Sequence, residues 1–156
     1  MAASRRLIED FLAEKRLAVI GVSRNPRHFS RRLFAELLRR GYDAVPVNPK
    51  AEQIEGLPCY PQVGQIQPPP AAALLMTPAR ASAQAVEECA QAGIRKVWLY
   101  RAVGRGAVSP AAAALCEARG MEAVVGLCPY MFLPGSSPVH RIHGWILKLG
   151  GSYPGP

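Results

Sequence analysis

Five short apolar runs, each followed by a turn or a polar segment, constrain this chain more than any other feature of its sequence. They cover residues 17–21, 43–47, 71–76, 96–100 and 122–126. Segments with apolar residues at helical spacing lie before and between them, so strand and helix patterns alternate. Parallel strands need such long crossovers, because tight turns join only antiparallel strands. The sequence therefore predicts an α/β fold with a doubly wound parallel five-stranded sheet.

Capping residues and glycines set the expected limits of the helices. Ser4 is the expected N-cap of a helix over residues 5–14, and Gly41 should end a helix over residues 29–38. Either Asn25, with Pro26 in the first helical position, or Ser30 could cap that second helix. Further helices are expected from 77 to about 92, from 109 to 120 and over 137–149, with residues 150–156 as a loose tail.

Length and composition indicate one domain, over residues 1–149. A chain of 156 residues with 49% hydrophobic residues can bury a core without disulfides, and the four cysteines are read as reduced thiols. The first residues carry acids within their apolar pattern, and no apolar run approaches the length of a membrane span. We therefore expect a soluble, cytoplasmic protein. The net charge of +8 favours anionic partners.

The carboxyl ends of the predicted strands are where a ligand should bind, because open α/β sheets bind ligands there. After the first strand, Gly21 permits a tight turn, and Ser23, Asn25 and the start of the next helix offer donors to an anion. This loop is interpreted as a phosphate-binding loop. The alternative is an ordinary turn with solvated arginines.

The second strand end argues against an ordinary NAD site. The Gly-x-Gly-x-x-Gly fingerprint is absent after the first strand, and Asn48 and Lys50 stand where an NAD site carries an acid for the ribose. A cation at that place prefers a phosphate group. The pattern thus favours a phosphorylated ligand on a Rossmann-like fold.

Three segments carry a specific family resemblance: residues 18–26 (AVIGVSRNP), 41–49 (GYDAVPVNP) and 97–99 (VWL). Together they resemble the stand-alone coenzyme A-binding domain family, which is similar to the N-terminal domain of the succinyl-CoA synthetase α subunit. The likeness covers about residues 16–130. One departure is Ala102, where family members usually carry glycine.

The resemblance implies a binding site for CoA or an acyl-CoA and a role for each strand end. By this resemblance, the loop after the first strand and the lysine after the second strand would hold the nucleotide and its phosphates. The segment after the third strand would line the adenine side. The end of the fourth strand would follow the pantetheine arm, and the segment after the fifth strand would form the floor of the site. The residues are Gly21, Val22, Ser23, Arg24 and Asn25; Val47, Asn48, Pro49 and Lys50; Met76, Thr77 and Pro78; Leu99, Tyr100 and Arg101; and Cys128 and Pro129.

Several alternatives stay open beside this prediction. The synthetase uses a phosphorylated histidine in a second domain that this chain lacks room for, so we expect binding without catalysis. An NADP-dependent oxidoreductase, with Arg24 or Lys50 at the 2′-phosphate, is the second interpretation. Nucleic-acid binding by a helix rich in arginine is a third and disfavoured one.

Some residues have both a structural and a functional interpretation. A metal site at His140 and His143 is disfavoured because zinc needs three or four ligands. Cys128 could be a reactive thiol, Trp98 is expected in the core, and Tyr100 could either pack or stack on adenine. Trp145 lies on a packed helix face or in the contact of a homodimer.

Overall fold

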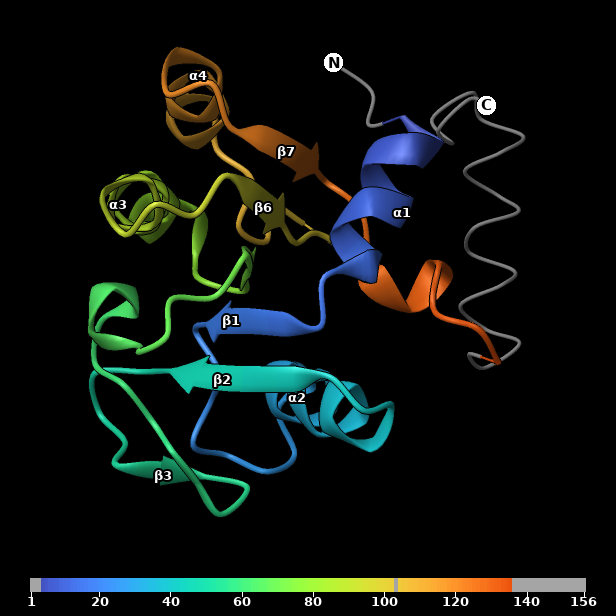
Figure 1. Ribbon diagram of the computed structural model, residues 1–156, viewed down its shortest axis with the longest axis vertical. Helices are drawn as coiled ribbons and strands as arrows, with labels where there is room; N and C mark the ends of the chain where they lie inside the picture. The colour runs from blue at the N-terminus through green and yellow to red at the C-terminus, as the bar shows by residue number, and fades with distance from the viewer. Residues whose placement is uncertain (1–3, 103, 136–156) are drawn as a thin grey trace.

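The computed structural model describes residues 4–102 and 104–135 as alternating strands and helices (Figure 1). The helices are α1 (Arg5–Ala13), α2 (Phe29–Arg39), α3 (Ala79–Gln91) and α4 (Pro110–Ala118), with two 3-10 turns, η1 (Val63–Gln65) and η2 (Pro129–Met131). The strands are β1 (Arg16–Ile20), β2 (Asp43–Val47), β3 (Gln53–Ile54), β4 (Leu57–Pro58), β5 (Ala72–Leu75), β6 (Lys96–Leu99) and β7 (Glu122–Val125). The helix expected over 137–149, the tail 150–156, and His140, His143 and Trp145 lie outside the described residues.

The main sheet contains the five predicted strands, all parallel, in the order β2-β1-β5-β6-β7. Each strand begins and ends within one residue of its predicted limits. From β1 the chain moves one place outward to β2, then crosses back to β5 on the other side of β1. The predicted doubly wound, Rossmann-like sheet is therefore confirmed, with its order reversing between β1 and β5.

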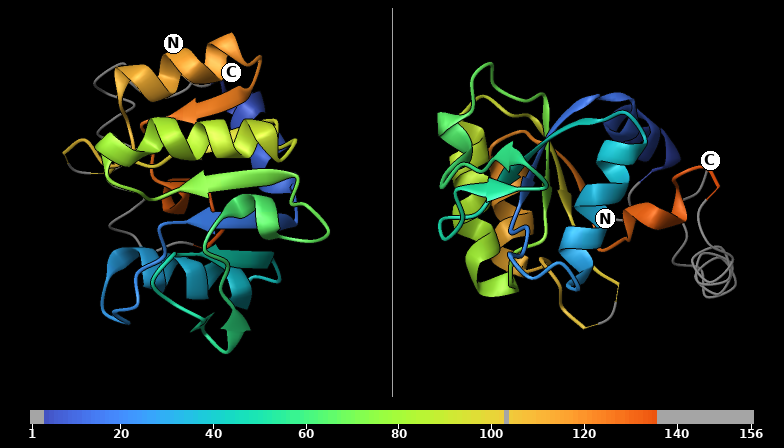
Figure 2. Two further views of the ribbon diagram at one scale, coloured as in Figure 1. Left: turned by 90° about the vertical axis from the view of Figure 1, so that its left-hand side faces the viewer. Right: turned by 90° about the horizontal axis from the view of Figure 1, so that it is seen from below.

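Alternating strand residues feed two hydrophobic cores, one on each face of the sheet. On one face, Leu17 and Leu74 pack with Phe11 of α1 and Phe34 of α2. On the other, residues such as Ala18 join the apolar sides of α3, α4 and η1. Figure 2 shows the same layering, with α1 and α2 on one side of the sheet and α3 and α4 on the other. Trp98 is fully buried in the first core, as predicted, and its indole N–H donates to the Leu127 carbonyl over 2.9 Å.

Two helix caps follow the prediction, and one does not. The Ser4 hydroxyl accepts from the Leu7 amide, and the Ser109 hydroxyl accepts from the Ala112 amide ahead of Pro110. At α2 neither expected residue is the cap, since His28 occupies that position and its ring accepts from the amide of Ser30.

The polar groups of the two residues expected at that cap are engaged elsewhere. The Asn25 side chain accepts from the Arg27 amide, which closes a turn before the helix. The Ser30 hydroxyl accepts from the Ser23 amide and so holds the loop after β1. The sequence offered two candidate caps, and the packed loop uses both for other hydrogen bonds and leaves the cap to His28.

Strand β2 lies at an edge of the sheet, as Pro46 predicts. The Tyr60 amide donates to the Pro46 carbonyl over 3.0 Å, and the Asn48 amide donates to the Tyr60 carbonyl over 2.9 Å. The main-chain groups of Pro46 therefore point away from β1. The proline removes a donor on the outer side of the strand and leaves its pairing with β1 complete.

Between β2 and β5 the chain forms a small hairpin that the sequence showed only as turns. Strands β3 and β4 pair antiparallel over two residues each. Glu55 and Gly56, with φ of 53° and 73°, form the two-residue turn between them. Both residues adopt a left-handed backbone conformation, with positive φ, as a type I′ hairpin turn requires.

No helix in the described part of the chain has the length and apolar content needed to cross a membrane.

Candidate functional site

Three strand ends meet around Gly21, at the place where the strand order reverses. The Gly21 amide donates to the Val47 carbonyl over 3.0 Å, and the Met76 amide donates to the Ile20 carbonyl over 2.8 Å. Gly21 has a φ of +90°, and a Cβ built on it would lie 3.0 Å from backbone atoms of Met76 and Thr77. Only glycine lets the loops after β1 and β5 approach this closely. The predicted turn at Gly21 is thus also a contact between two loops.

The loop after β1 is held by its own side chains. The Ser23 hydroxyl accepts from the Asn25 amide, while Ser30 from α2 anchors Ser23. Arg31 of α2 approaches the carbonyls of Ser23 and Arg24 at 3.5 and 3.2 Å and pairs with Glu55 of the hairpin at 2.6 Å. The amides of Ser23, Asn25 and Arg27 are thus bonded within this segment, so the Ser23 hydroxyl and the Asn25 side-chain nitrogen, rather than these amides, are the donors that it can offer an anion.

The loop after β2 is cross-linked to the first loop by Asn48. Its side-chain nitrogen donates to the Val22 carbonyl over 2.7 Å, and its side-chain oxygen accepts from the Lys50 amide over 2.8 Å. Val22 is fully buried. An asparagine fits this place better than the acidic residue of an NAD site, because its side-chain amide can both donate and accept, whereas an ionised carboxylate only accepts.

Three exposed cations lie on these two loops. Arg24 and Arg27 follow β1, and Lys50 follows β2. Within residues 4–102 and 104–135, none of the three forms an ion pair. Their charge is not neutralised by neighbouring carboxylates, so it can attract the phosphates of a ligand.

A groove of about 540 Å³ opens beside Gly21, between the carboxyl end of the sheet, η1 and α3. Four predicted site residues line it: Gly21, Val47, Pro49 and Thr77. The remaining lining residues are Ile20, Pro61, Gln62, Gln65, Ala81, Gln84, Ala85 and Glu88. Its volume lies in the usual range for small-molecule sites.

The sequence did not reveal the outer walls of this groove. Those walls come from η1, which lies well after β2 in the sequence, and from the first three turns of α3, which follows β5 closely. Ser82 is another missed positioning residue: its buried hydroxyl lies 3.0 Å from the Thr77 hydroxyl and donates to the Pro78 carbonyl. Ser30 in α2 plays the same part for the first loop. A buried serine in the first turns of a helix is the signal that could have marked both.

The predicted site residues for the pantetheine arm lie at the ends of β6 and β7. Some of their side chains are buried in the core, and others lie at the surface. Leu99 and Cys128 are buried, as is Pro129 at the start of η2. These three residues therefore belong to the core and expose little or no surface to a ligand. Arg101 is exposed, and its guanidinium lies over Gly126, 3.2 Å from the place of a Cβ there.

Tyr100 packs on an aromatic neighbour of the protein itself. Its ring stacks on Phe29 of α2 with a centroid distance of 5.3 Å, and Tyr130 meets Phe29 edge-on at 5.7 Å. Met76 packs against the same core, on the opposite side of the sheet from the groove. Of the segment predicted for the adenine side, Thr77 thus lines the groove and Met76 does not.

Burial opposes ionisation of the two titratable groups at this rim. It raises the pKa of the Tyr100 phenol to about 12 and that of the Cys128 thiol to about 11. Cys128 is therefore protonated at neutral pH, which argues against the reactive thiol that the sequence left open. Among the described residues there is also no cluster of three or more His, Cys, Asp or Glu that could hold a metal.

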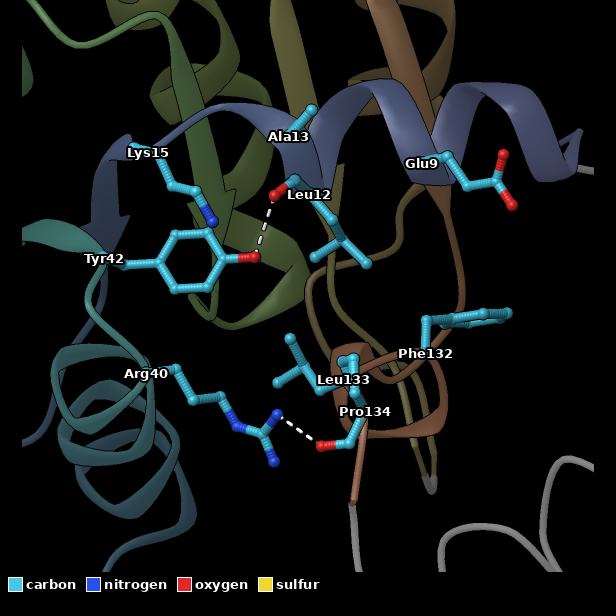
Figure 3. A pocket seen from close by; sticks show the side chains of 9 residues that line it. All are labelled: Glu9, Leu12, Ala13, Lys15, Arg40, Tyr42, Phe132, Leu133 and Pro134. Carbon is cyan, nitrogen blue, oxygen red and sulfur yellow. Dashed lines mark hydrogen bonds between the residues drawn. The ribbon is translucent and has the colours of Figure 1, made fainter.

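A second hollow, of about 500 Å³, lies at the amino ends of the strands, and no predicted site residue lines it (Figure 3). The Tyr42 hydroxyl donates to the Leu12 carbonyl over 2.8 Å, and Lys15 lies 4.7 Å from the centroid of the Tyr42 ring. On the other side Arg40 donates to the Pro134 carbonyl. These contacts join α1, α2 and the segment after η2 around the hollow.

A comparison with protein families matches residues 15–134 to the CoA binding domain. The chain belongs to this family. The match begins just before β1 and ends after η2, so it includes every strand end described above.

Curated relatives share the domain within longer proteins. The chain is 33% identical over 90 residues to acetate–CoA ligase [ADP-forming] II of Archaeoglobus fulgidus, a match that covers 56% of this chain and 13% of the ligase. It is 27% identical over 97 residues to the α subunit of acetate–CoA ligase [ADP-forming] II of Pyrococcus furiosus, covering 62% of this chain and 21% of that subunit. The chain thus spans a small part of the curated relatives it matches.

Solved structures with the same fold include small proteins of similar length. A conserved hypothetical protein from Pyrococcus furiosus is 30% identical with a TM-score of 0.68, and the match covers 73% of this chain and 95% of that one. A hypothetical protein from Pyrococcus horikoshii is 27% identical with a TM-score of 0.72, covering 80% and 84%.

Proposed function

We propose that this CoA-binding domain binds coenzyme A or an acyl-CoA across the carboxyl edge of its sheet, without catalysis of its own. The nucleoside end would occupy the groove beside Gly21, and the phosphates would lie at the loop after β1, near Arg24 and Lys50. The pantetheine arm would pass over Tyr100 and Arg101 toward the end of β7.

This proposal rests on one observation: the groove lies next to two cationic side chains that form no ion pair within the described residues. Groove residues Gly21 and Pro49 directly flank the loops that bear Arg24 and Lys50. A ligand with a planar apolar end and several phosphates matches that arrangement, because the groove can take the ring while the cations meet the charge. The acid that an NAD ribose prefers is replaced by Asn48, whose side chain is already engaged.

Binding without catalysis is supported by the chemistry of the rim. Tyr100 and Cys128 both have pKa values raised far above neutrality by burial, so neither supplies a base or a nucleophile at pH 7. The ligase reactions named for the curated relatives belong to proteins of which this chain matches a small part. A cytoplasmic location, one domain over residues 1–149 and an association into homodimers stay predictions beside this proposal.

Isothermal titration calorimetry with CoA, acetyl-CoA, dephospho-CoA and NADPH tests the proposal. We expect binding of CoA, and a loss of affinity of about tenfold to a hundredfold in Lys50→Ala, because a hydrogen bond to a charged group contributes about 1.5–3 kcal/mol. Lys15→Ala is the matched control, since Lys15 is also exposed but lies at the amino-end hollow.

Two results would contradict the proposal. Absence of detectable binding to CoA, acetyl-CoA and dephospho-CoA would remove it. Tight binding of NADPH with no heat from CoA would replace it with an NADP site, in which Arg24 or Lys50 meets the 2′-phosphate.

A further inference from the structure

The groove beside Gly21 is lined in part by small or rigid apolar residues. On the α3 side it is lined by Ala81 and Ala85, which follow each other by one helical turn. On the other side it is lined by Pro49 and Pro61. Small and rigid apolar groups on both sides leave room for a flat aromatic body and lose little side-chain entropy when they are covered.

The groove lining on α3 also contains a glutamine whose amide is oriented by a hydrogen bond. The Gln84 side-chain nitrogen donates to a Glu88 carboxylate oxygen over 3.0 Å, and both residues line the groove. A carboxylate only accepts hydrogen bonds, so the amide must turn its NH₂ group toward Glu88. The amide oxygen and the second N–H of Gln84 are then left to meet a ligand.

We propose that Gln84 recognises the amino edge of adenine and that Glu88 positions it for this task. The inference rests on the proposed function, and it adds which residues select the adenine that CoA carries. Adenine presents an amino donor beside a ring-nitrogen acceptor, and a glutamine amide pairs with this edge through two hydrogen bonds. Gln84 offers the complementary acceptor and donor in the orientation that Glu88 imposes.

A purine with an oxygen at C6 cannot form the same two hydrogen bonds with Gln84. Its C6 oxygen would face the Gln84 amide oxygen, and two acceptors repel. Turning the amide to relieve this contact would direct its oxygen at the Glu88 carboxylate instead. The pair therefore discriminates between the bases, whereas a free glutamine could turn over and accept either one.

The test compares adenosine 3′,5′-bisphosphate with inosine 3′,5′-bisphosphate, two probes that differ at the C6 edge of the base. Their dissociation constants are measured by calorimetry for the unmodified chain and for Gln84→Ala, Glu88→Gln and Gln91→Ala. We expect the unmodified chain to prefer the adenosine compound by about tenfold or more. Gln84→Ala should reduce that ratio to near one.

Glu88→Gln distinguishes positioning from a merely structural role. An amide at residue 88 can pair with Gln84 in either orientation, so the ratio should fall while affinity for the inosine compound is kept or rises. Gln91→Ala is the matched control, because Gln91 pairs with Glu87 on the same helix at 3.2 Å and does not line the groove. Its ratio should equal that of the unmodified chain.

The possible failures are separable. If the unmodified chain binds CoA but holds both bisphosphates equally, the inference is overturned and the proposed function stands. If Glu88→Gln keeps the full preference, the positioning role of Glu88 is overturned. If neither CoA nor the bisphosphates bind, the inference and the proposed function fall together.

Discussion

Replacing Gly21 by alanine tests whether the loops after β1 and β5 are as close as the structure shows. The substitution carries two costs. A non-glycine residue at a φ of +90° is strained by about 1–2 kcal/mol. The added Cβ would also lie 3.0 Å from the Met76 carbonyl and the Thr77 nitrogen, and such backbone atoms can yield only if a loop shifts. Overpacking of this kind costs about a further 1–3 kcal/mol.

Gly41→Ala is the matched control for the strain alone. Gly41 has a φ of +83°, and a Cβ there would meet nothing within 4 Å. Both variants therefore acquire the backbone strain, and only Gly21→Ala adds the overlap. For a domain of this size 1 kcal/mol shifts Tm by about 2–4 °C, so Gly21→Ala should melt about 2–12 °C below Gly41→Ala.

The assays are thermal unfolding by circular dichroism and CoA titration by calorimetry. Because Gly21 lines the groove, its variant should also bind CoA more weakly, whereas Gly41→Ala should bind as the unmodified chain does. Equal melting temperatures for the two variants would refute the close approach of the loops. Equal CoA affinity would refute the placement of the ligand beside Gly21.

Two further predictions concern titrating groups. All four thiols are buried, and burial raises the pKa of Cys89 to about 12 and those of Cys116 and Cys128 to about 11. Thiol-reactive dyes should therefore label the native protein slowly at pH 8 and label four thiols once it is denatured. Fast labelling of native Cys128 would contradict its burial. Hydrogen bonds from Arg39, and then from Arg40, lower the pKa of Glu36 from 4.5 to about 2 against an opposing effect of burial. The ionised Glu36 stabilises the fold fully above about pH 4.5, and this effect is lost as pH falls toward 2. Glu36→Gln should therefore lower the free energy of unfolding at pH 6 and make its decrease in acid less steep. Glu9→Gln, which breaks an exposed pair with Arg5, should change neither the free energy of unfolding at pH 6 nor its decrease in acid.

The strands were predictable because each is an apolar run bounded by a clear stop. Strand β5 reads Ala-Ala-Leu-Leu and is buried at every residue, and its limits follow from Pro70 before it and Pro78 after it. Pro46 suited either the start of a strand or an edge strand, and the structure has β2 at an edge of the sheet. In such segments the local pattern and the tertiary environment agree.

The parts that the sequence did not reveal depend on contacts between distant segments. Strands β3 and β4 have two residues each, too few for an alternating pattern to show. The cap at His28 depends on where the hydroxyl of Ser30 is used, which is set by Ser23 in another loop. The groove is lined by residues of α3 and η1, and Gln84 and Pro61 come to line the same groove only once both segments pack on the sheet.

The pairing of Tyr60 with the outer side of β2 also bears on how copies of the protein can associate. The Pro46 carbonyl and the Asn48 amide are already bonded to Tyr60, and Pro46 itself has no hydrogen to give. An incoming strand from another molecule would find neither a donor nor an acceptor in register along this stretch. Pairing with a strand of another molecule is therefore blocked at Pro46 and Asn48, which disfavours growth of an intermolecular sheet from this part of the edge.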